Sequence, residues 1–135
     1  MKIVLDTNLV FSAILKPNSL ISELLHKHEF QFYAPEFLKE EINKHKEKII
    51  QLAAYTFQEF ENQKHHVYRR IMFLNEFQIQ TKNYKTAKAL VSDIDRMDIL
   101  FVALAEELDC HLWTSDLKLV HGLRQKEYKK VITTD

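Results

Sequence analysis

The sequence predicts an α/β fold in which helices cover both faces of a parallel sheet. Short apolar runs of strand type alternate along the chain with segments whose apolar residues recur at helical spacing. Strands that alternate with helices are joined by right-handed crossovers into a parallel sheet. With 1 Gly and 2 Pro in 135 residues there is little room for long loops or linkers, so we expect residues 1–135 to form a single domain.

The first strand and the first two helices are expected near the amino terminus. Residues 3–5 form an apolar run that ends in turn-forming residues, which is typical of a buried strand that meets a loop. Apolar residues at helical spacing follow over residues 9–13 and 20–28. Pro17, Asn18 and Ser19 separate these two segments, so two short helices are expected.

The second strand is expected over residues 30–34, which alternate and are rich in aromatic side chains. Pro35 follows at once and suits the first position of a helix, which we expect to run from Pro35 to about Lys48. Residues 49–77 keep a helical pattern, which predicts one or two further helices.

The second half of the chain supplies three further strand candidates. Residues 77–80 alternate strictly and predict a third strand, followed by a short helix over residues 84–92. The apolar residues from Ile99 continue through Leu108 with several alanines, which favours a buried helix over a strand. The fourth and fifth strands are expected over residues 110–114 and 130–133.

Four acidic residues stand where a parallel sheet would place a binding site. Ligands of such sheets bind beyond the carboxyl ends of the strands. Asp6 ends the first strand and Asp116 follows the fourth, so both point to one crevice if those strands are neighbours. Asp98 opens the apolar helix, and Glu41 lies one to two turns inside the helix after the second strand.

Carboxylates that converge in one crevice repel each other, which raises their pKa values unless a cation is bound. Oxygen ligands without a Cys or His set select Mg²⁺ or Mn²⁺ over Zn²⁺. Such ions activate water and stabilise the charge that develops on a phosphate, so hydrolysis of a phosphodiester is the expected chemistry. Spacing alone does not establish this site, because a chain with 19 acidic residues places some of them near strand ends by chance.

Family resemblance adds specific support. Four segments resemble, in order, the four motifs of PIN-domain nucleases: residues 3–8 with Ser12, residues 34–42, residues 95–98 with 101–105, and residues 112–119. The second motif of the family is a helix that begins with Pro and carries an essential Glu before an aliphatic residue. The match spans nearly the whole chain and is closest to the branch of single-domain prokaryotic toxins of toxin–antitoxin pairs.

The resemblance implies a three-layer sandwich around about five parallel strands and an endoribonuclease that depends on Mg²⁺ or Mn²⁺. It also implies an RNA substrate, a frequent homodimer and a possible cognate antitoxin protein. The implied catalytic residues and metal ligands are Asp6, Glu41, Asp98 and Asp116, with Asp95 as a further metal ligand. The residues expected to orient the metal ligands or to contact the substrate are Thr7, Asn8, Ser12, Thr114 and Ser115, although caps of the following helices would explain several of them equally well.

Two choices between neighbouring acids stay open. Glu41 is preferred over Glu40 because an aliphatic residue follows it, and Glu40 would face about 100° away around the helix. Asp95 and Asp98 share a helical face if that turn forms, so Asp95 either assists or replaces Asp98. Ser115 stands where a Gly is common before the last acid of the family.

Composition limits the remaining possibilities. The formal net charge is zero, so any RNA binding must be local, for example at Lys82, Lys85 and Lys88 or at Arg124, Lys126, Lys129 and Lys130. One cysteine, Cys110, excludes an internal disulfide and suits a reducing cytoplasm. The amino terminus does not resemble a signal peptide and no apolar run is long enough for a membrane span, so we expect a cytoplasmic protein. The rival function is a catalytically inactive PIN-fold module that binds RNA or protein, and an aspartyl-phosphate enzyme is a weaker third.

Overall fold

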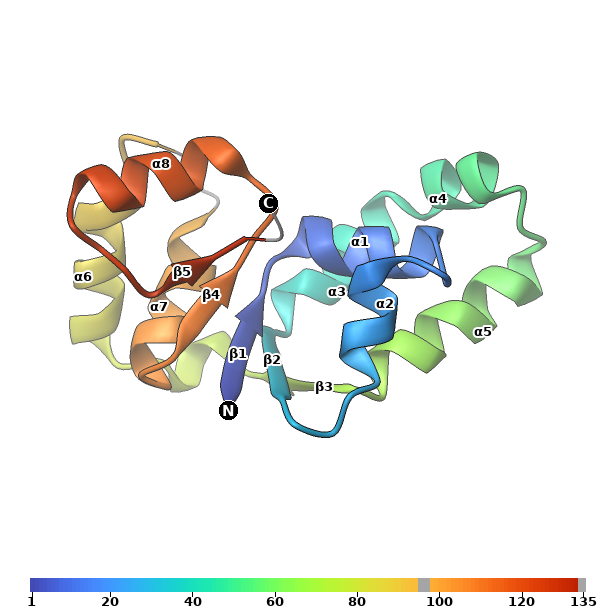
Figure 1. Cartoon of the computed structure of the whole chain (residues 1–135), viewed down its shortest axis with the longest axis horizontal. Helices are drawn as coiled ribbons and strands as arrows, with labels where there is room; N and C mark the ends of the chain where they lie inside the picture. The colour runs from blue at the N-terminus through green and yellow to red at the C-terminus, as the bar shows by residue number, and fades with distance from the viewer. Residues whose placement is uncertain (95–97, 134–135) are drawn as a thin grey trace.

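The computed structural model describes residues 1–94 and 98–133. Five parallel strands form one sheet in the order β3-β2-β1-β4-β5 (Figure 1). Their bounds are β1 Lys2–Leu5, β2 Gln31–Pro35, β3 Ile71–Leu74, β4 His111–Trp113 and β5 Val131–Ile132. The chain moves outward from β1 to β3, then returns across the sheet to β4 and β5. The direction in which the chain adds successive strands to the sheet therefore reverses between β1 and β4. Open parallel sheets bind ligands at such a point.

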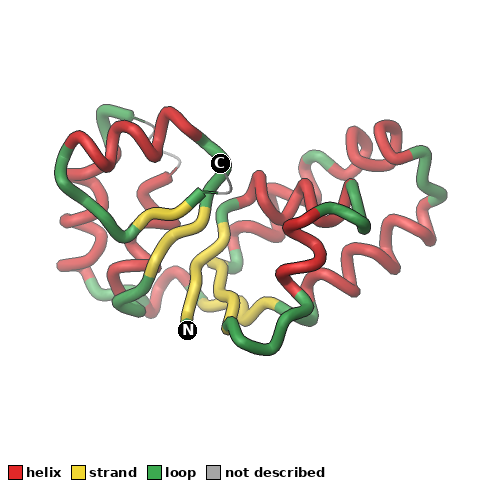
Figure 2. Tube along the Cα trace, in the orientation of Figure 1, coloured by secondary structure: helices red, strands yellow, loops and turns green. Residues whose placement is uncertain are grey.

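Helices cover both faces of this sheet, as the three-layer prediction requires. Right-handed crossovers place the helices before β3 on one face and those after β3 on the other, and Figure 2 shows these two groups of helices apart. The first group comprises α1 Thr7–Leu15, α2 Leu20–Leu25, α3 Phe37–Lys44, α4 Lys46–Ala53 and α5 Phe57–Tyr68. The second comprises α6 Thr81–Val91, α7 Ile99–Glu107 and α8 Leu117–Gln125, and the short 3₁₀ turn η1 Glu76–Gln78 precedes it.

The core includes the contact between the central strand β1 and the helix α7. Ile3, Val4 and Leu5 of β1 are all buried, because a central strand is covered on both of its faces. Residues 101–105 of α7 are also all buried, since this helix packs against β1, β2, β4 and α6. A helix that is apolar all round belongs inside a protein, so the prediction of a buried helix here is confirmed.

The third strand was predicted in the wrong place. It forms at Ile71–Leu74, whereas residues 77–80 lie in η1 and the loop after it. Asn75 caps this turn, because its side chain accepts a 2.8 Å hydrogen bond from the Phe77 amide. The Phe77 side chain is 95% exposed, so the alternation of residues 77–80 reflects no sheet face.

The helix after β2 also differs from the prediction at both of its ends. Pro35 is the last residue of β2, and the helix begins only at Phe37. That helix ends at Lys44, and α4 begins at Lys46 after a break at His45. The helix α8, which follows Asp116, was not predicted.

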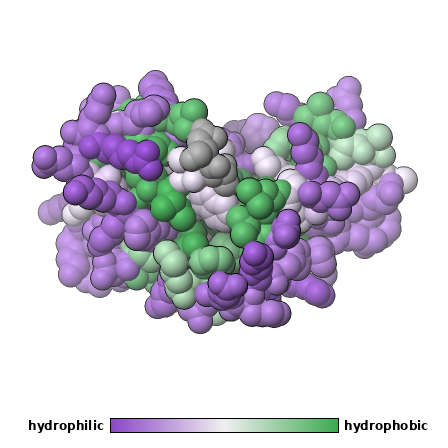
Figure 3. Space-filling view, viewed as in Figure 1, coloured by the Kyte–Doolittle hydropathy of each residue, from purple (hydrophilic) through white to green (hydrophobic). Residues whose placement is uncertain are grey.

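The surface in the view of Figure 3 is mostly polar around its rim, while apolar side chains gather near its middle. An apolar groove of about 280 Å³ is lined by Met1, Ile3, Leu20, Leu24, Phe30, Trp113, Ile132 and Thr133. Within the described residues, no helix combines the length and the apolar character that crossing a membrane would need.

Candidate functional site

The candidate site forms at the carboxyl ends of β1 and β4. These strands are parallel neighbours, with Leu5 opposite Trp113. The Asp6 amide donates to the Trp113 carbonyl at 3.3 Å, which extends their pairing by one residue. Asp6 and Asp116 therefore approach the same crevice although 110 positions separate them, as the sequence predicted for neighbouring strands.

Asp6 is a buried acid held by two donors. Its Oδ1 accepts a 3.0 Å hydrogen bond from the Leu9 amide, so Asp6 caps the amino terminus of α1. Its Oδ2 accepts a hydrogen bond from the Thr114 hydroxyl. Burial raises the Asp6 pKa from 3.8 to about 6, against the lowering effect of these two bonds. The negative charges of Asp116 and Glu41 raise this pKa further, so both lie within electrostatic reach of Asp6.

Thr114 joins Asp6 to Asp116. Its side chain is fully buried, and its Oγ1 accepts a 3.0 Å hydrogen bond from the Asp116 amide while its hydroxyl donates to Asp6. Asp116 in turn caps α8, because its Oδ1 accepts from the Lys118 and Leu119 amides at 3.1 and 3.3 Å. This cap explains why a helix follows directly after Asp116.

Glu41 reaches the site from α3. Its Oε1 accepts a 2.6 Å hydrogen bond from the Thr7 hydroxyl in the first turn of α1. Glu40, the alternative in the sequence, has an exposed side chain and lies outside the pocket. The geometry therefore brings Glu41, and not Glu40, to the carboxyl end of β1.

Asp98 is the residue before α7 and faces the same space. Asp95, the alternative or additional ligand in this segment, falls outside the described residues.

The four predicted acids line one pocket of about 230 Å³, which we call the acidic pocket. Its walls are Asp6, Thr7, Asn8, Glu41, Asp98, Phe101 and Asp116. Thr114 does not line it but holds Asp6 in place. Ser12, one turn further along α1 than Asn8, and Ser115, which is exposed, are not among the lining residues.

Phe101 is the pocket residue that sequence reasoning missed. The sequence placed it in the third motif and in the apolar helix but not in the site, although it follows Asp98 by three positions and therefore lies about one turn along the same face. Its buried ring closes one wall of the pocket with an apolar surface.

The donor chemistry of the acidic pocket suits a hard cation. Its polar walls offer carboxylate, hydroxyl and amide oxygens, and no His or Cys lines it. Within residues 1–94 and 98–133, no three acidic, His or Cys side chains are yet arranged to hold an ion. Hydrogen bonds from Thr7, Thr114 and the amides of Leu9, Lys118 and Leu119 occupy carboxylate oxygens of Asp6, Glu41 and Asp116.

Several other polar residues lie outside the acidic pocket. His26 and His66 stack on each other with ring centroids 4.4 Å apart, so they serve packing between α2 and α5. Lys126 and Lys130 form salt bridges with Asp93 and Asp109. Cys110 is a buried free thiol whose pKa burial raises to about 11.

Comparison with known proteins agrees with this architecture. A family model described as "PIN domain" matches residues 4–134. The crystal structure of VapBC2 from Rickettsia felis bound to a DNA fragment from their promoter contains a similar chain, with a TM-score of 0.73 and 17% sequence identity over 100% of both chains. At this identity the likeness shows the fold. Comparison with curated proteins gives no significant match.

Proposed function

Because the chain belongs to the PIN-domain family, a family of nucleases, we propose that it is a metal-dependent endoribonuclease that hydrolyses RNA phosphodiester bonds. The observation that supports this most directly is the acidic pocket, in which Asp6, Glu41, Asp98 and Asp116 converge from four separate segments. A fold has no structural need for four acids around one polar cavity, since their mutual repulsion destabilises it. A function that requires a cation accounts for them.

The proposed ligands of Mg²⁺ or Mn²⁺ are these four carboxylates, with Asp95 as an additional one. When bound, such an ion activates water and stabilises the charge that develops on the phosphate during hydrolysis. Asp6 has a pKa of about 6 in the protein alone, so it takes up a proton under mildly acidic conditions. That proton competes with a cation for the same oxygens.

Neighbouring residues prepare the carboxylates for this role. The Thr114 hydroxyl fixes Asp6, and the Thr7 hydroxyl fixes Glu41. Asn8 is exposed at the wall of the acidic pocket, where its side-chain amide can donate to a phosphate oxygen. The ring of Phe101 excludes water from one side, which strengthens electrostatic interactions in the pocket.

The proposal includes a biological role as the toxin of a toxin–antitoxin pair in the cytoplasm. The motifs resemble that branch of the family, and the similar VapBC2 structure is a complex bound to promoter DNA. An antitoxin protein and a second copy of this chain are the proposed partners. The apolar groove beside α2 supports a protein interface, because exposed apolar grooves of this kind mark interaction sites.

A catalytically inactive binding module is the second candidate. It is favoured by one observation, namely that no group of three ligands in the described residues is arranged to hold an ion. All four acids of the family pattern are present in the sequence, which favours the nuclease.

The test is cleavage of a panel of fluorescent RNAs with Mn²⁺, with Mg²⁺ and with excess EDTA. Asp6→Asn keeps the size of the side chain and the cap of α1 but removes the charge, so it should abolish cleavage while the protein stays folded. Asp109→Asn is the matched control, because Asp109 precedes β4 at the opposite end from Asp116 and its side chain is exposed. Activity that survives Asp6→Asn, or that persists in EDTA, contradicts the assignment.

A further inference from the structure

The strand β3, which has four residues, lies at one edge of the sheet. In the described part of the chain it pairs with β2 alone. Its sequence, Ile-Met-Phe-Leu, contains no charged residue and no Pro. Soluble proteins normally protect an edge strand with charges, a Pro, a bulge or a covering segment, because its open backbone groups pair with other chains.

The open backbone groups of β3 can be identified. The Leu74 carbonyl accepts a 3.0 Å hydrogen bond from the Glu36 amide, so the polar groups of Leu74 point toward β2. Within a strand, the N–H and C=O of one residue point to the same edge and those of the next residue to the other. Ile71 and Phe73 therefore direct their N–H and C=O groups away from β2. Among the described residues, no hydrogen bond from another segment reaches these four groups.

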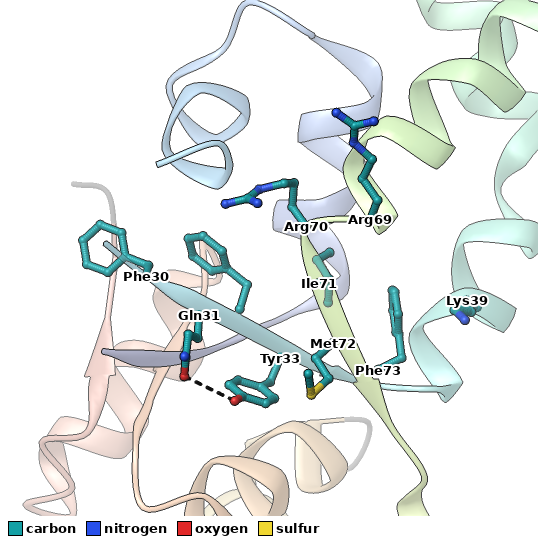
Figure 4. A pocket seen from close by; sticks show the side chains of 10 residues that line it. Phe30, Gln31, Tyr33, Lys39, Arg69, Arg70, Ile71, Met72 and Phe73 are labelled. Carbon is teal, nitrogen blue, oxygen red and sulfur yellow. Dashed lines mark hydrogen bonds between the residues drawn. The ribbon is translucent and has the colours of Figure 1, made fainter. Parts of the chain in front are cut away.

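The side chains of β3 divide between the two faces of the sheet. Figure 4 shows Ile71 and Phe73 on one side of the strand, and Met72 with Tyr33 on the other. Met72 is 58% exposed although it lies directly opposite the buried Tyr33 in the pairing with β2. A second strand at this edge would cover Met72.

Positive charge gathers at this edge. A pocket of about 580 Å³ along β2 and β3 is lined by Lys39, Arg69 and Arg70, and none of its described lining residues is acidic (Figure 4). The Arg70 Nε donates to the Leu25 carbonyl at 2.9 Å, and Lys39 pairs with Glu36 at 3.3 Å. Arg69 is exposed and forms no salt bridge with any residue that the structure describes.

We propose that β3 is the docking site of a partner protein, which adds an extended acidic segment to the sheet as a sixth strand. The open groups of Ile71 and Phe73 match the backbone of a peptide, and the basic residues match acidic side chains. Alternation in that segment would place acids toward Arg69 and Lys39, and apolar side chains over Met72. A second copy of this chain fits less well, because the same basic residues would then face each other across the new interface.

This docking site is independent of the proposed nuclease activity, since it uses no residue of the acidic pocket. RNA would also be attracted by Arg69, but a phosphate backbone cannot pair with alternating amide and carbonyl groups. A bound peptide strand would form hydrogen bonds with the amides of Ile71 and Phe73, whereas bound RNA would not, and this difference distinguishes the two occupants.

The test uses a fluorescein-labelled peptide of alternating Glu and Val, about eight residues long, which is the length of an ordinary strand. Fluorescence anisotropy with the full chain should give a Kd below about 100 µM. A peptide with Lys in place of Glu, and one with methylated backbone nitrogens, should bind at least about tenfold more weakly. Arg69→Glu should weaken binding about fivefold or more, whereas Lys85→Glu, an exposed charge reversal on α6, should leave it unchanged.

Amide exchange measured by NMR provides the decisive readout. On peptide binding, the amides of Ile71 and Phe73 should become protected, while those of Met72 and Leu74, already bonded to β2, should change little. The proposal is overturned if the acidic peptide does not bind, or if it binds without this protection. A dimer detected by sedimentation, in which both amides are already protected, would also overturn it, because a second copy would then occupy β3. Displacement of the peptide by an oligouridine from the wild type but not from Arg69→Glu would overturn it too, because RNA would then be the occupant.

Discussion

The hydroxyl of Thr7 donates a 2.6 Å hydrogen bond to the carboxylate of Glu41, and this contact joins the first turn of α1 to the middle of α3. The two residues lie 34 positions apart, so only the folded sheet brings them together. A carboxylate that accepts such a bond loses rotational freedom and one of its lone pairs. Glu41 is thereby fixed at the wall of the acidic pocket before any ligand arrives.

Thr7→Val should reduce RNA cleavage by about tenfold or more, because loss of a group that orients a metal ligand typically has an effect of this size. Thr7→Ser keeps the hydroxyl and should retain most of the activity. Cleavage rates measured over a range of Mn²⁺ concentrations provide the check, and the Val variant should need more Mn²⁺. Thr86→Val removes an exposed hydroxyl from α6 and should have no effect on cleavage. Equal rates for all three variants would show that Thr7 plays no part in positioning Glu41.

The raised pKa of Asp6 predicts a pH dependence of stability in the absence of divalent cations. Between the ordinary pKa of 3.8 and the folded pKa of about 6, the folded protein binds more protons at Asp6 than the unfolded chain does. The free energy of unfolding therefore falls as the pH rises through this window. Above about pH 6 the loss is complete and is on the order of 3 kcal/mol.

Asp6→Asn removes this titration, so the variant should be more stable than the wild type at pH 7 and similar to it near pH 4. Urea denaturation in EDTA at several pH values measures the difference between the two proteins, which cancels the other titrating groups. Added Mg²⁺ should stabilise the wild type at pH 7 but not the variant, because ligand binding to the folded state raises its stability. Parallel pH profiles for the two proteins would contradict the assigned pKa.

Thr114 should be required for both stability and the pKa of Asp6. Thr114→Val leaves the Asp116 amide without its acceptor and Asp6 without one donor, which should cost about 1–3 kcal/mol of unfolding free energy. Because the Thr114 bond lowers the Asp6 pKa, its loss should raise that pKa further. Thr114→Ser keeps the hydroxyl and should cost only about 1 kcal/mol for the missing methyl group. In the absence of metal, the pH-dependent fall in unfolding free energy should extend to higher pH in Thr114→Val than in Thr114→Ser. The same pH midpoint of this change in both variants would contradict the role of the hydroxyl.

The acidic pocket could be predicted because its residues are defined by local sequence and sheet topology. Asp6 and Asp116 each follow an apolar strand directly, and parallel strands end at the same edge of a sheet. Glu41 was preferred over Glu40 because an aliphatic residue follows it, and Glu41 is the one of the two that lines the pocket. Ser12 and Ser115 were predicted near the site but do not line the pocket, because their distance from it depends on how α1 and the β4 loop pack.

The position of β3 could not be predicted, for a physical reason. Ile71–Leu74 follows α5 after only two residues and is itself apolar, so it prolongs the helical pattern of the preceding segment. An edge strand with one exposed residue shows no clear alternation. What selects the strand is pairing with β2, a tertiary interaction that local propensity does not contain.

The only glycine of the sequence, Gly122, allows α8 to pack closely against Ile94. Ile94 lies three residues after the end of α6. A Cβ on Gly122 would lie 2.3 Å from Cδ1 and 2.9 Å from Cγ1 of Ile94. Ala is better than Gly inside a helix by about 1 kcal/mol, but overpacking of this kind costs about 1–3 kcal/mol. Gly122→Ala should therefore destabilise the wild type slightly, yet stabilise Ile94→Ala, in which the clash is absent. Urea denaturation of the four proteins measures this coupling, and an equal effect of Gly122→Ala in both backgrounds would show that Ile94 does not require the glycine.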